Sequence, residues 1–427
     1  MKLRIEKAIY GGAGLARADG KAVFVPFTLP GELVEAEIAE ENKSYATAEL
    51  QAVLEASGER RSAACAYFGA CGGCHYQHAE YAAQVEMKRA ILRETLERAR
   101  VGAIPEIEAV TGEPFGYRNR VRLHVEKNPF HLCYKRRNSH VNLPVEACPV
   151  AAPVLERAMA TLNGEGSGLG LGLGLGDWVR EVELFTDDAQ GAVLAGFWTD
   201  RPGAEAKRLL DSCWTRLQKA LPECVGAGVF SAERGAMTGK LLAQAGEAAL
   251  TYRAAGRGYR VGLGAFFQVN RLLIERLVEL VTGGRTGDVA WDLYAGVGLF
   301  SLALTEGFGE VVAVESGGAA VRDLRENLRG TRHRVVLAET AAFLRHAKGT
   351  PGLVVVDPPR AGLGREVTTL LGKVRARNVT YVSCDPATLS RDVAALLESG
   401  YRLAKMHLVD LFPQTFHLES VAQLTLE

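Results

Sequence analysis

A cysteine and a carboxylate follow two short apolar segments in the last fifth of the chain. Cys384 comes directly after residues 378–383, NVTYVS, and Asp357 comes directly after residues 354–356, VVV. Segments rich in β-branched residues that end at Pro or Asp turns are typical of buried strands, and parallel strands present their carboxyl ends to ligands at one edge of a sheet. A single buried cysteine is most often a small core residue, but the pairing with Asp357 favours a thiol that does chemistry.

A glycine-rich turn upstream has the pattern of a nucleoside-binding site. Residues 288–293, DVAWDL, predict a strand that runs into Tyr294-Ala-Gly-Val-Gly, where glycines let the backbone approach a ligand. The next apolar segment ends at Glu315, 23 residues after Asp292, and an acid at that spacing is placed to bind ribose hydroxyls. Ser301 stands where a dinucleotide-binding turn has its third small residue, so the pattern is closer to an S-adenosylmethionine pocket than to an NAD pocket. Another nucleotide binder and a solvated strand-end acid are the alternatives.

A separate set of four cysteines has the spacing of a metal site. The set is Cys65, Cys71, Cys74 and Cys148. Two glycines between the second and third cysteines permit a tight turn, and the proline after the fourth resembles the end of ferredoxin cysteine runs. Thiolates select iron–sulfur clusters or zinc, and structural zinc favours two closely spaced cysteine pairs, which the fourth cysteine lacks. We therefore expect a 4Fe-4S cluster, with zinc or unligated thiols as alternatives.

The other cysteines lie in ordinary surroundings. Cys133 is the rival fourth ligand, but its neighbours read as a plain strand, and Cys213 and Cys224 look like packing residues. Eight cysteines without a secretory signal indicate reduced thiols, metal ligands or catalysis rather than disulfides.

The composition excludes several classes of protein. Lys and Arg number 50 and Asp and Glu number 50, so any contact with RNA must come from local basic patches and not from the net charge. The first residues have no apolar core or cleavage site, and no apolar run of about 18 residues could span a membrane. We expect a cytoplasmic protein with no membrane contact, and a chain of 427 residues predicts two or three domains.

Three regions follow one another, which predicts a multidomain α/β protein. Residues 1–58 alternate apolar and polar residues between closely spaced glycine turns, a pattern that suits a small OB-like β-barrel. Residues 59–260 form a mixed central domain with the four cysteines and a basic helical segment at about 78–100, which could pack on the last region. Residues 261–427 alternate strands with helices, which predicts a Rossmann-like parallel sheet. The Gly/Leu stretch 164–176 is low-complexity and is expected to be a loop or insertion.

A basic stretch in the central region predicts an RNA-binding surface. Between residues 117 and 140, seven cations stand against the single acid Glu126, and aromatic residues lie among them. The cations are Arg118, Arg120, Arg122, Lys127, Lys135, Arg136 and Arg137. Such a stretch could grip phosphates while the aromatic rings stack on unpaired bases. A solvated strand face is the alternative.

Five motifs resemble those of the RNA uracil-5 methyltransferase family. They are Phe266-Phe267-Gln268-Val-Asn270, Asp292-Leu-Tyr294-Ala-Gly296-Val-Gly298, Asp357-Pro-Pro-Arg360, Ser383-Cys384-Asp385-Pro386 and Phe412-Pro-Gln-Thr-Phe-His-Leu-Glu419. They occur in the family's order, residues 1–55 resemble its TRAM domain, and the four-cysteine set resembles its iron–sulfur branch, typified by 23S rRNA enzymes. The resemblance implies a class I methyltransferase domain, S-adenosylmethionine as methyl donor and an RNA substrate.

The resemblance also implies roles for individual residues. Uracil C5 is a poor nucleophile, and a thiolate that adds to C6 enables C5 to attack a methyl group. By resemblance, Cys384 is this nucleophile and Glu419 is the base that removes the C5 proton. The residues that match the family's S-adenosylmethionine contacts are Gln268, Tyr294, Glu315 and Asp357. Phe267 could stack on a flipped base or belong to the core, and the target uridine should lie in a loop or be extruded.

Three positions depart from the family's pattern. Asp385 follows the nucleophile where relatives more often have Asn. A neighbouring anion would raise the pKa of the Cys384 thiol, unless the carboxylate points away or is hydrogen-bonded elsewhere. Ala295 and Leu299 replace residues that are often Cys and polar in relatives, and none of these changes removes a proposed catalytic group.

We therefore predict an S-adenosylmethionine-dependent RNA uracil-5 methyltransferase, a monomer that acts on 23S rRNA and carries a structural iron–sulfur cluster. A tRNA uracil-5 methyltransferase is the alternative substrate assignment. An amino-methyltransferase that uses Asp-Pro-Pro-Arg would not need Cys384, and a non-catalytic iron–sulfur RNA-binding protein would not bind S-adenosylmethionine. The sequence does not identify the target uridine.

Overall fold

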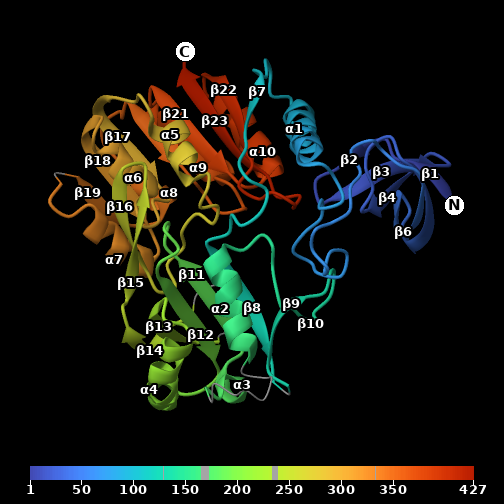
Figure 1. The fold of residues 1–427 in the computed structure, drawn as a ribbon. Coiled ribbons are helices and arrows are strands. Elements are labelled where there is room, and N and C mark those ends of the chain that lie inside the picture. The colour runs from blue at the N-terminus through green and yellow to red at the C-terminus, as the bar shows by residue number, and fades with distance from the viewer. Residues whose placement is uncertain (128, 165–172, 233–238, 332) are drawn as a thin grey trace.

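The computed structural model describes residues 1–427 except 128, 165–172, 233–238 and 332 (Figure 1). The described residues form three large β-sheets and one hairpin, with helices against the second and third sheets. The N-terminal sheet stands to one side, and the central sheet lies below the C-terminal sheet in the view of Figure 1. Among the described residues, no helix has the length and apolarity needed to cross a membrane.

The N-terminal sheet closes into a barrel. Its strands are β1 (Lys2–Arg4), β2 (Lys7–Ala8), β3 (Ala13–Ala18), β4 (Lys21–Pro26), β5 (Leu33–Glu41) and β6 (Tyr45–Glu55). β1 pairs with β5, and the Glu6 amide just after β1 donates to the Leu15 carbonyl of β3 at 2.7 Å, so the first strand bridges both ends of the sheet. Alternate apolar side chains such as Leu3, Val23 and Val34 fill the interior, because successive residues of a strand face opposite sides.

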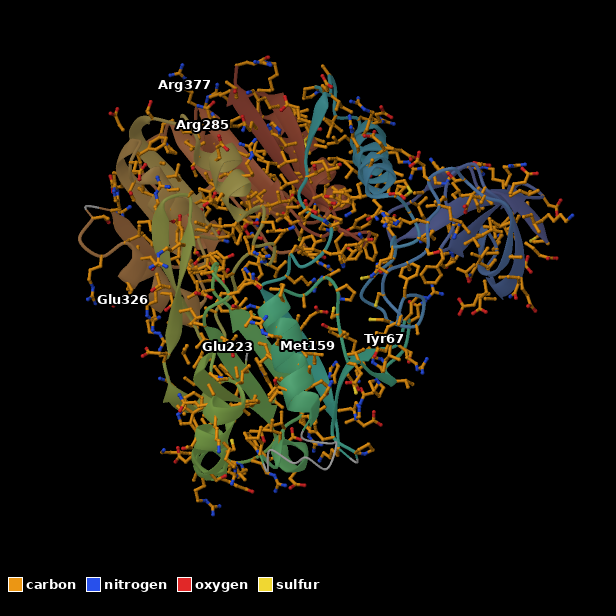
Figure 2. The ribbon with its side chains drawn as sticks, in the orientation of Figure 1. Tyr67, Met159, Glu223, Arg285, Glu326 and Arg377 are labelled. Carbon is orange, nitrogen blue, oxygen red and sulfur yellow. The ribbon has the colours of Figure 1, made fainter. Side chains whose placement is uncertain are left out.

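The central sheet has seven described strands in the order β10-β9-β8-β11-β12-β13-β14. They are β8 (Arg120–Glu126), β9 (His131–Lys135), β10 (Asn142–Pro144), β11 (Glu181–Thr186), β12 (Val193–Thr199), β13 (Cys224–Ser231) and β14 (Leu241–Gly246). Helices α2 (Pro153–Asn163) and α4 (Gly203–Ala220) bury apolar side chains in its core, and Figure 2 labels one of them, Met159. Of the Gly/Leu stretch 164–176, residues 165–172 lie outside the described residues, and its last residues begin the short helix α3 (Leu175–Trp178).

The C-terminal sheet has eight strands in the order β19-β18-β17-β20-β21-β23-β22-β7. They are β7 (Ile107–Val110), β17 (Gly287–Leu293), β18 (Phe308–Glu315), β19 (Arg334–Leu337), β20 (Leu353–Val356), β21 (Asn378–Ser383), β22 (Tyr401–Val409) and β23 (Glu419–Leu426). The accompanying helices are α5 (Ile274–Thr282), α6 (Leu299–Leu304), α7 (Gly318–Asn327), α8 (Thr340–His346), α9 (Gly364–Val374) and α10 (Pro386–Glu398). β17 to β21 are parallel, as predicted for a Rossmann-like sheet, and β23 is antiparallel to both of its neighbours. The hairpin of β15 (Ala249–Ala254) and β16 (Arg257–Gly262) comes just before α5 and β17 in the chain.

The C-terminal sheet also includes residues from upstream of the central sheet. α1 (Tyr81–Arg98) buries Leu92 and Leu96 in the same core as β22, and β7 pairs with β22 in parallel (Figure 1). Lys88 of α1 is fully buried, and its Nζ lies 2.6 Å from a carboxylate oxygen of Asp410, just after β22. The helix expected at about 78–100 is therefore present and packs on the C-terminal sheet.

Candidate active site

The carboxyl edge of the C-terminal sheet carries a thiol and several carboxyl groups. Asp292 lies near the end of β17, Glu315 is the last residue of β18, and Asp357 follows β20. Cys384 follows β21, which is the neighbour of β20 as the sequence pattern predicted. Because these four strands are parallel, their ends meet at one edge, which is where open α/β sheets bind ligands.

The register of β21 and β23 brings Cys384 next to Glu419. The last residue of β21, Ser383, pairs with Ser420, whose hydroxyl donates to the Ser383 carbonyl at 3.2 Å. The strands are antiparallel, so the residue after Ser383 and the residue before Ser420 lie opposite each other at the edge of the sheet. Those two residues are Cys384 and Glu419, the predicted nucleophile and the predicted base.

The thiol of Cys384 is protonated in the free protein. Burial, followed by the carboxyl groups of Glu419 and Asp357, raises the pKa of this thiol to about 11, against the opposing effect of the Arg360 guanidinium. Arg360 also contacts the ring of His417, with Nη2 and Nδ1 separated by 3.2 Å. Burial and then Arg360 lower the pKa of His417 to about 3, so its ring is neutral and accepts from the guanidinium. Sequence reasoning quoted Arg360 within a motif but did not assign it this position.

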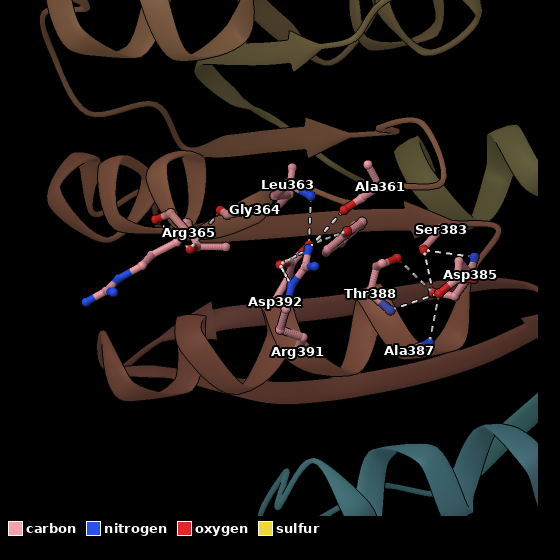
Figure 3. Close-up of polar contacts among 12 residues, drawn as sticks. Ala361, Leu363, Gly364, Arg365, Ser383, Asp385, Ala387, Thr388, Arg391 and Asp392 are labelled. Carbon is pink, nitrogen blue, oxygen red and sulfur yellow. Dashed lines mark hydrogen bonds and ion pairs between the residues drawn. The ribbon is translucent and has the colours of Figure 1, made fainter.

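The carboxylate of Asp385 is turned onto the helix that follows it. Asp385 is the N-cap of α10, and its Oδ1 accepts from the amides of Ala387, at 3.0 Å, and Thr388, at 2.9 Å (Figure 3). Helix N-termini stabilise carboxylates through their free N–H groups and the helix dipole. The Asp385 carboxylate is therefore hydrogen-bonded elsewhere. With its charge turned away in this manner, Asp385 is compatible with a reactive thiol at Cys384.

Three buried acids at this edge of the sheet have a raised pKa. The pKa of Glu419 is raised well above its usual range by burial and then by Asp357. Burial and then Asp292 raise the pKa of Asp357 to about 7, although Gln268 opposes the shift by donating from Nε2 to Oδ2 at 3.2 Å. Burial raises the pKa of Asp292 to about 7 as well, and the hydroxyl of Ser301 donates to this carboxyl group at 2.5 Å. Such a cluster of shifted acids at a sheet edge is typical of a functional site.

The glycine turn after β17 wraps around the carboxylate of Glu315. Tyr294, Gly296 and Gly298 have left-handed φ values of +69°, +56° and +93°, and a Cβ at Gly298 would lie 2.7 Å from Leu324. One oxygen of Glu315 accepts from the Gly296 amide at 2.8 Å, and the other accepts from an amide at the start of the next loop. A non-glycine residue at positive φ is strained, and such strain is concentrated at binding sites.

Gln268 is positioned by a residue that sequence reasoning missed. Asn119, buried just before β8 of the central sheet, donates from its side chain to the Gln268 carbonyl at 2.9 Å and from its amide to the Val269 carbonyl at 2.9 Å. Asn270 completes the anchoring by donating to the Leu411 carbonyl at 3.1 Å. The sequence carries no specific signal for this role, because the contact joins residues about 150 positions apart in the chain. The hydrogen-bonding capacity of an asparagine side chain is the one local hint.

Phe267 belongs to the hydrophobic core. It is 2% exposed and packs among Tyr252, Tyr259 and Phe185. The expectation that it could stack on a base is therefore wrong. Its neighbour Phe266 is 65% exposed, and it stands two residues before Gln268.

The four-cysteine set lies between the barrel and the central sheet. Cys65, Cys71 and Cys74 lie between β6 and α1, and Cys148 precedes α2. Tyr67 (Figure 2) links the two segments, because its hydroxyl accepts from the Glu146 amide at 2.9 Å. Burial is the main reason why the pKa of each of the first three thiols is raised, and the Cys148 sulfur contributes to all three shifts, so the structure brings the set together.

The spacing of the set differs from that of a single-ion site. Within the described ranges, no three His, Cys, Asp or Glu side chains are arranged to hold one metal ion. A 4Fe-4S cluster binds its four thiolates on four separate irons, so its ligands stand further apart than those of one ion. Cys133 on β9 instead contacts the Glu126 carboxylate at 3.7 Å, and Cys213 and Cys224 are fully buried in the core.

Positive charge and a hydroxyl face the four cysteines. The Arg118 guanidinium lowers the pKa of Cys71 and Cys74, and the hydroxyl of Tyr134 is hydrogen-bonded to the Cys148 sulfur. The Nε of Arg118 is buried, and it has no hydrogen-bond partner in the part of the chain that the structure describes. A cation and polar donors of this kind fit an anionic thiolate cluster.

Part of the predicted RNA-binding stretch has a structural role instead. Arg120 bonds to Glu183 at 2.5 Å and lies over the ring of Phe185 at 4.3 Å. Arg122 likewise bonds to Glu181 at 2.6 Å and lies over the ring of Trp198. The prediction that these two arginines grip phosphates is therefore wrong, because the neighbouring strand β11 supplies carboxylates that the local sequence does not show.

The parallel sheet has the fold of S-adenosylmethionine-dependent methyltransferases, with a glycine turn and acidic residues at its carboxyl edge. A solved structure of the Pyrococcus abyssi tRNA (uracil-54, C5)-methyltransferase in complex with S-adenosyl-L-homocysteine has this fold throughout. The match covers 100% of both chains, with a TM-score of 0.79 and 24% sequence identity.

Sequence comparisons define the family. The model of the tRNA (uracil-5-)-methyltransferase family matches residues 347–426, and that of the TRAM domain matches residues 1–51. An RNA methyltransferase of Aquifex aeolicus is 34% identical over 444 residues, which cover 99% of this chain and 98% of the relative. A 23S rRNA (uracil(1939)-C(5))-methyltransferase RlmD of Chromohalobacter salexigens is 34% identical over 437 residues, 99% of this chain and 89% of the relative. The chain therefore belongs to the S-adenosylmethionine-dependent RNA uracil-5 methyltransferases, and the predicted family and TRAM domain are confirmed.

Proposed function

We propose that this enzyme methylates C5 of a uridine in 23S rRNA through a covalent bond between Cys384 and C6 of the base. The observation that carries the proposal is the placement of Cys384 opposite Glu419, with Asp357 close to both. A thiol beside a buried carboxyl group supplies the two groups that the reaction requires, a nucleophile and a base.

Each group acts in one defined step. The Cys384 sulfur forms a bond to C6, and the electron pair of the C5–C6 double bond is displaced to give an enolate. C5 of the enolate then bonds to the methyl carbon as the bond between that carbon and the sulfonium sulfur breaks, and the thioether S-adenosylhomocysteine leaves with the electron pair. Glu419 next takes the proton from C5, the electron pair re-forms the double bond, and the sulfur leaves C6. The net change exchanges one proton at C5 for one methyl group.

Burial that raises the pKa of both groups has to be offset when the substrates bind. Cys384 must lose its proton before it can attack, and Glu419 must be ionised before it can accept the C5 proton. Arg360 already lowers the pKa of Cys384. The methyl donor is a sulfonium cation, so its binding beside Asp357 would favour the charged form of both the thiol and the carboxyl group.

Four residues are proposed to hold S-adenosylmethionine, which supplies the methyl group. They are Gln268, Tyr294, Glu315 and Asp357. The two amide hydrogens that Glu315 accepts fix its carboxylate and leave further lone pairs for ribose hydroxyls. Gln268 and Asp357 are bonded to each other at the same edge, which preorganises both for a ligand.

Phe266 is proposed to stack on the target base. Its ring is exposed, whereas its neighbour Phe267 is buried, and it stands two residues from Gln268. A uridine must leave its stack before C5 and C6 can reach buried groups, and an exposed ring at the mouth of the site would replace the lost stacking.

We also propose that Cys65, Cys71, Cys74 and Cys148 hold a 4Fe-4S cluster. The donor set fits, because four thiols are gathered next to the Arg118 cation and the Tyr134 hydroxyl. The cluster would cross-link the segment before α1 to the segment before α2. The role is structural, since methyl transfer exchanges no electron.

The substrate assignment rests on the relatives. The Chromohalobacter salexigens relative, which is named for uracil 1939 of 23S rRNA, is 34% identical to this chain. The Pyrococcus abyssi enzyme, which is named for uracil 54 of tRNA, is 24% identical. We also propose that the enzyme acts in the cytoplasm as a monomer, because its proposed substrate is cellular RNA.

Two measurements test the proposed function. RNA that carries 5-fluorouridine at the target should form a stable adduct with the wild-type protein loaded with cluster and S-adenosylmethionine, because fluorine cannot leave C5 as a proton does. Cys384→Ala should form no adduct, and an adduct with this variant would refute the assignment of the nucleophile. Mass mapping of 5-methyluridine in a deletion strain should show its loss from 23S rRNA, and a loss confined to tRNA would refute the substrate.

A further inference from the structure

One turn of the N-terminal barrel reaches the candidate active site. Residues 9–13 join β2 to β3, and the Ile9 amide donates to the Ala13 carbonyl at 2.9 Å. Gly11 and Gly12 adopt the left-handed region, and a Cβ at Gly12 would lie 3.0 Å from the Cβ of His75. The turn therefore fits closely against the segment that carries three of the four cysteines, and it presents the side chain of Tyr10 to the C-terminal sheet.

Tyr10 touches both segments that carry the proposed catalytic groups. Its hydroxyl lies 3.5 Å from the carbonyl oxygen of Cys384. Its ring meets the ring of Phe416 edge to face, with centroids 5.3 Å apart, and Phe416 stands three residues before Glu419. A residue of the barrel thus spans the turn of the nucleophile and the segment that leads to the base.

The carboxylate of Asp385, the next residue, lies near the same hydroxyl. A separation of 3.5 Å is long for a bond from a hydroxyl to a carbonyl, whereas bonds to an ionised acceptor are shorter and stronger. The pKa of Tyr10 is raised above its usual range by burial and then by the charge of Asp385. The phenol therefore keeps its proton and remains a donor at every pH at which the enzyme works.

We infer that Tyr10 is a positioning residue of the active site, whose hydroxyl contacts the Cys384 carbonyl beside the N-terminus of α10 and thereby orients the turn of Cys384 and Asp385. The inference rests on the proposed function, in which Cys384 is the nucleophile. Two backbone amides already donate to the Asp385 carboxylate, and a Tyr10 hydroxyl beside it would help to keep it turned away from the thiol. The barrel would then complete the catalytic turn in addition to binding RNA.

Several charged or titratable groups near Cys384 affect the pH dependence of its alkylation. They come from β23, the loop after β20, the cap of α10 and the barrel turn. They are Glu419, Asp357, Arg360, Asp385 and Tyr10. Only the last two are changed in the variants below, so the effects of the other three are common to all measurements.

The test compares Tyr10→Phe, Asp385→Asn and the double variant in the full-length protein with its cluster. The rate of alkylation of Cys384 by iodoacetamide is followed by peptide mass spectrometry as a function of pH, and kcat and KM are measured with target RNA. Tyr10→Phe keeps the ring against Phe416 and removes one hydroxyl. It should slow alkylation at neutral pH and lower kcat by about 2- to 10-fold, the range that the net free energy of one hydrogen bond gives, and leave KM for RNA unchanged.

The double variant decides how Tyr10 acts. With an uncharged amide at position 385, removal of the hydroxyl should have no further effect on the alkylation profile. An equal effect of Tyr10→Phe in both backgrounds would overturn the inference, as would a change in KM alone, which would make Tyr10 an RNA contact. No effect of Tyr10→Phe on either measurement would also overturn it.

Two controls separate this inference from the proposed function. Tyr45→Phe removes a hydroxyl from an exposed tyrosine elsewhere in the barrel and should leave the alkylation profile unchanged. If Cys384→Ala still methylates RNA, the proposed function itself is wrong. If Cys384→Ala is inactive and Tyr10→Phe behaves as the wild type, only the role of Tyr10 is wrong.

Discussion

The backbone amide of His75 lies 2.8 Å from the carbonyl of Gln414 and donates a hydrogen bond to it. The Tyr76 amide donates to the same carbonyl, and Gln84 of α1 exchanges two further bonds of 3.0 Å with Gln414. His75 follows Cys74, and Gln414 stands five residues before Glu419. The segment of the proposed cluster ligands is therefore bonded directly to the segment that delivers the proposed base.

Loss of the cluster should impair chemistry more than cofactor binding. Cys74→Ser, which removes one proposed ligand, should loosen the segment 412–418 and lower the rate of adduct formation with 5-fluorouridine RNA by about 10- to 100-fold, because a small misplacement of a catalytic group is costly. Affinity for S-adenosylmethionine, measured by calorimetry, should stay within about twofold of the wild type, since its proposed contacts lie on other strands. Hydrogen exchange should rise in the segment 412–418. Cys133→Ser is the matched control, and equal losses in the two variants would contradict the coupling.

Glu419→Gln should trap the reaction after methyl transfer. The amide cannot accept the C5 proton, so the sulfur of Cys384 stays bonded to C6 of the methylated base. Turnover should fall by about 100- to 10,000-fold, the usual contribution of a general base. A protein–RNA band that resists denaturation should accumulate with ordinary uridine RNA. Release of methylated RNA at the wild-type rate would show that another group removes the proton.

Replacement of Arg360 should make the thiol less reactive. Arg360→Gln removes the cation that lowers the pKa of Cys384, so that pKa should rise further above about 11. Each unit of increase lowers the thiolate fraction at neutral pH about tenfold, and alkylation of Cys384 should slow in proportion. Arg365→Gln is the control, because its side chain extends away from Asp385 in Figure 3. An unchanged alkylation rate in Arg360→Gln would refute this account of the site.

Arg118 should be required for retention of the cluster. Its buried guanidinium acts on the thiols of Cys71 and Cys74, and loss of such an outer contact to metal ligands typically weakens metal binding about 10- to 100-fold. Arg118→Met should therefore be purified under anaerobic conditions with less iron and with weaker visible absorption from the cluster. Arg122→Met, which changes an arginine that is bonded to Glu181 on the same stretch, should keep its iron. Equal iron contents in the two variants would contradict the prediction.

Asp292 should make the protein less stable as the pH rises from about 4 to about 7. Its pKa is 3.8 in the unfolded chain and about 7 in the fold, so the unfolded state releases this proton first, and ionisation in the folded state is penalised across that window. The penalty is complete above about pH 7 and amounts to at most about 4 kcal/mol. In urea unfolding, Asp292→Asn should gain stability relative to the wild type over this window. A difference that is constant with pH, or one matched by the exposed control Asp288→Asn, would refute the prediction.

The residues at the strand ends could be predicted because their signals are local. The composition of the segments before Asp357 and Cys384 predicts buried strands. Because parallel strands present their carboxyl ends at one ligand-binding edge, both residues are expected there, and β20 and β21 are indeed parallel neighbours. The position of Glu419 opposite Cys384 could not be obtained in this way. It depends on β23 being inserted between β21 and β22, a pairing between distant segments that no local pattern encodes.

The errors of prediction have a common physical origin. Arg120 and Arg122 look like free cations in sequence, and their carboxylate partners lie on a strand about 60 residues away. Phe266 and Phe267 are adjacent residues of the same type, and only the fold decides which ring faces the core. In both cases the outcome is set by tertiary neighbours and not by the residue or its flanks.

The chain enters the C-terminal sheet twice, first with α1 and β7 and again with β17 to β23. The central sheet lies between these entries and is tied to its neighbour at both ends, so it cannot swing about a single linker. The backbone connects the barrel through residues 56–80, and its orientation is set by packing of Ala8 and Leu29 with the core of the C-terminal sheet and by contacts such as the ion pair of Lys7 with Glu94 at 2.6 Å. The backbone thus restrains the central sheet at two points and the barrel at one, so the orientation of the barrel depends more on side-chain packing than that of the central sheet does.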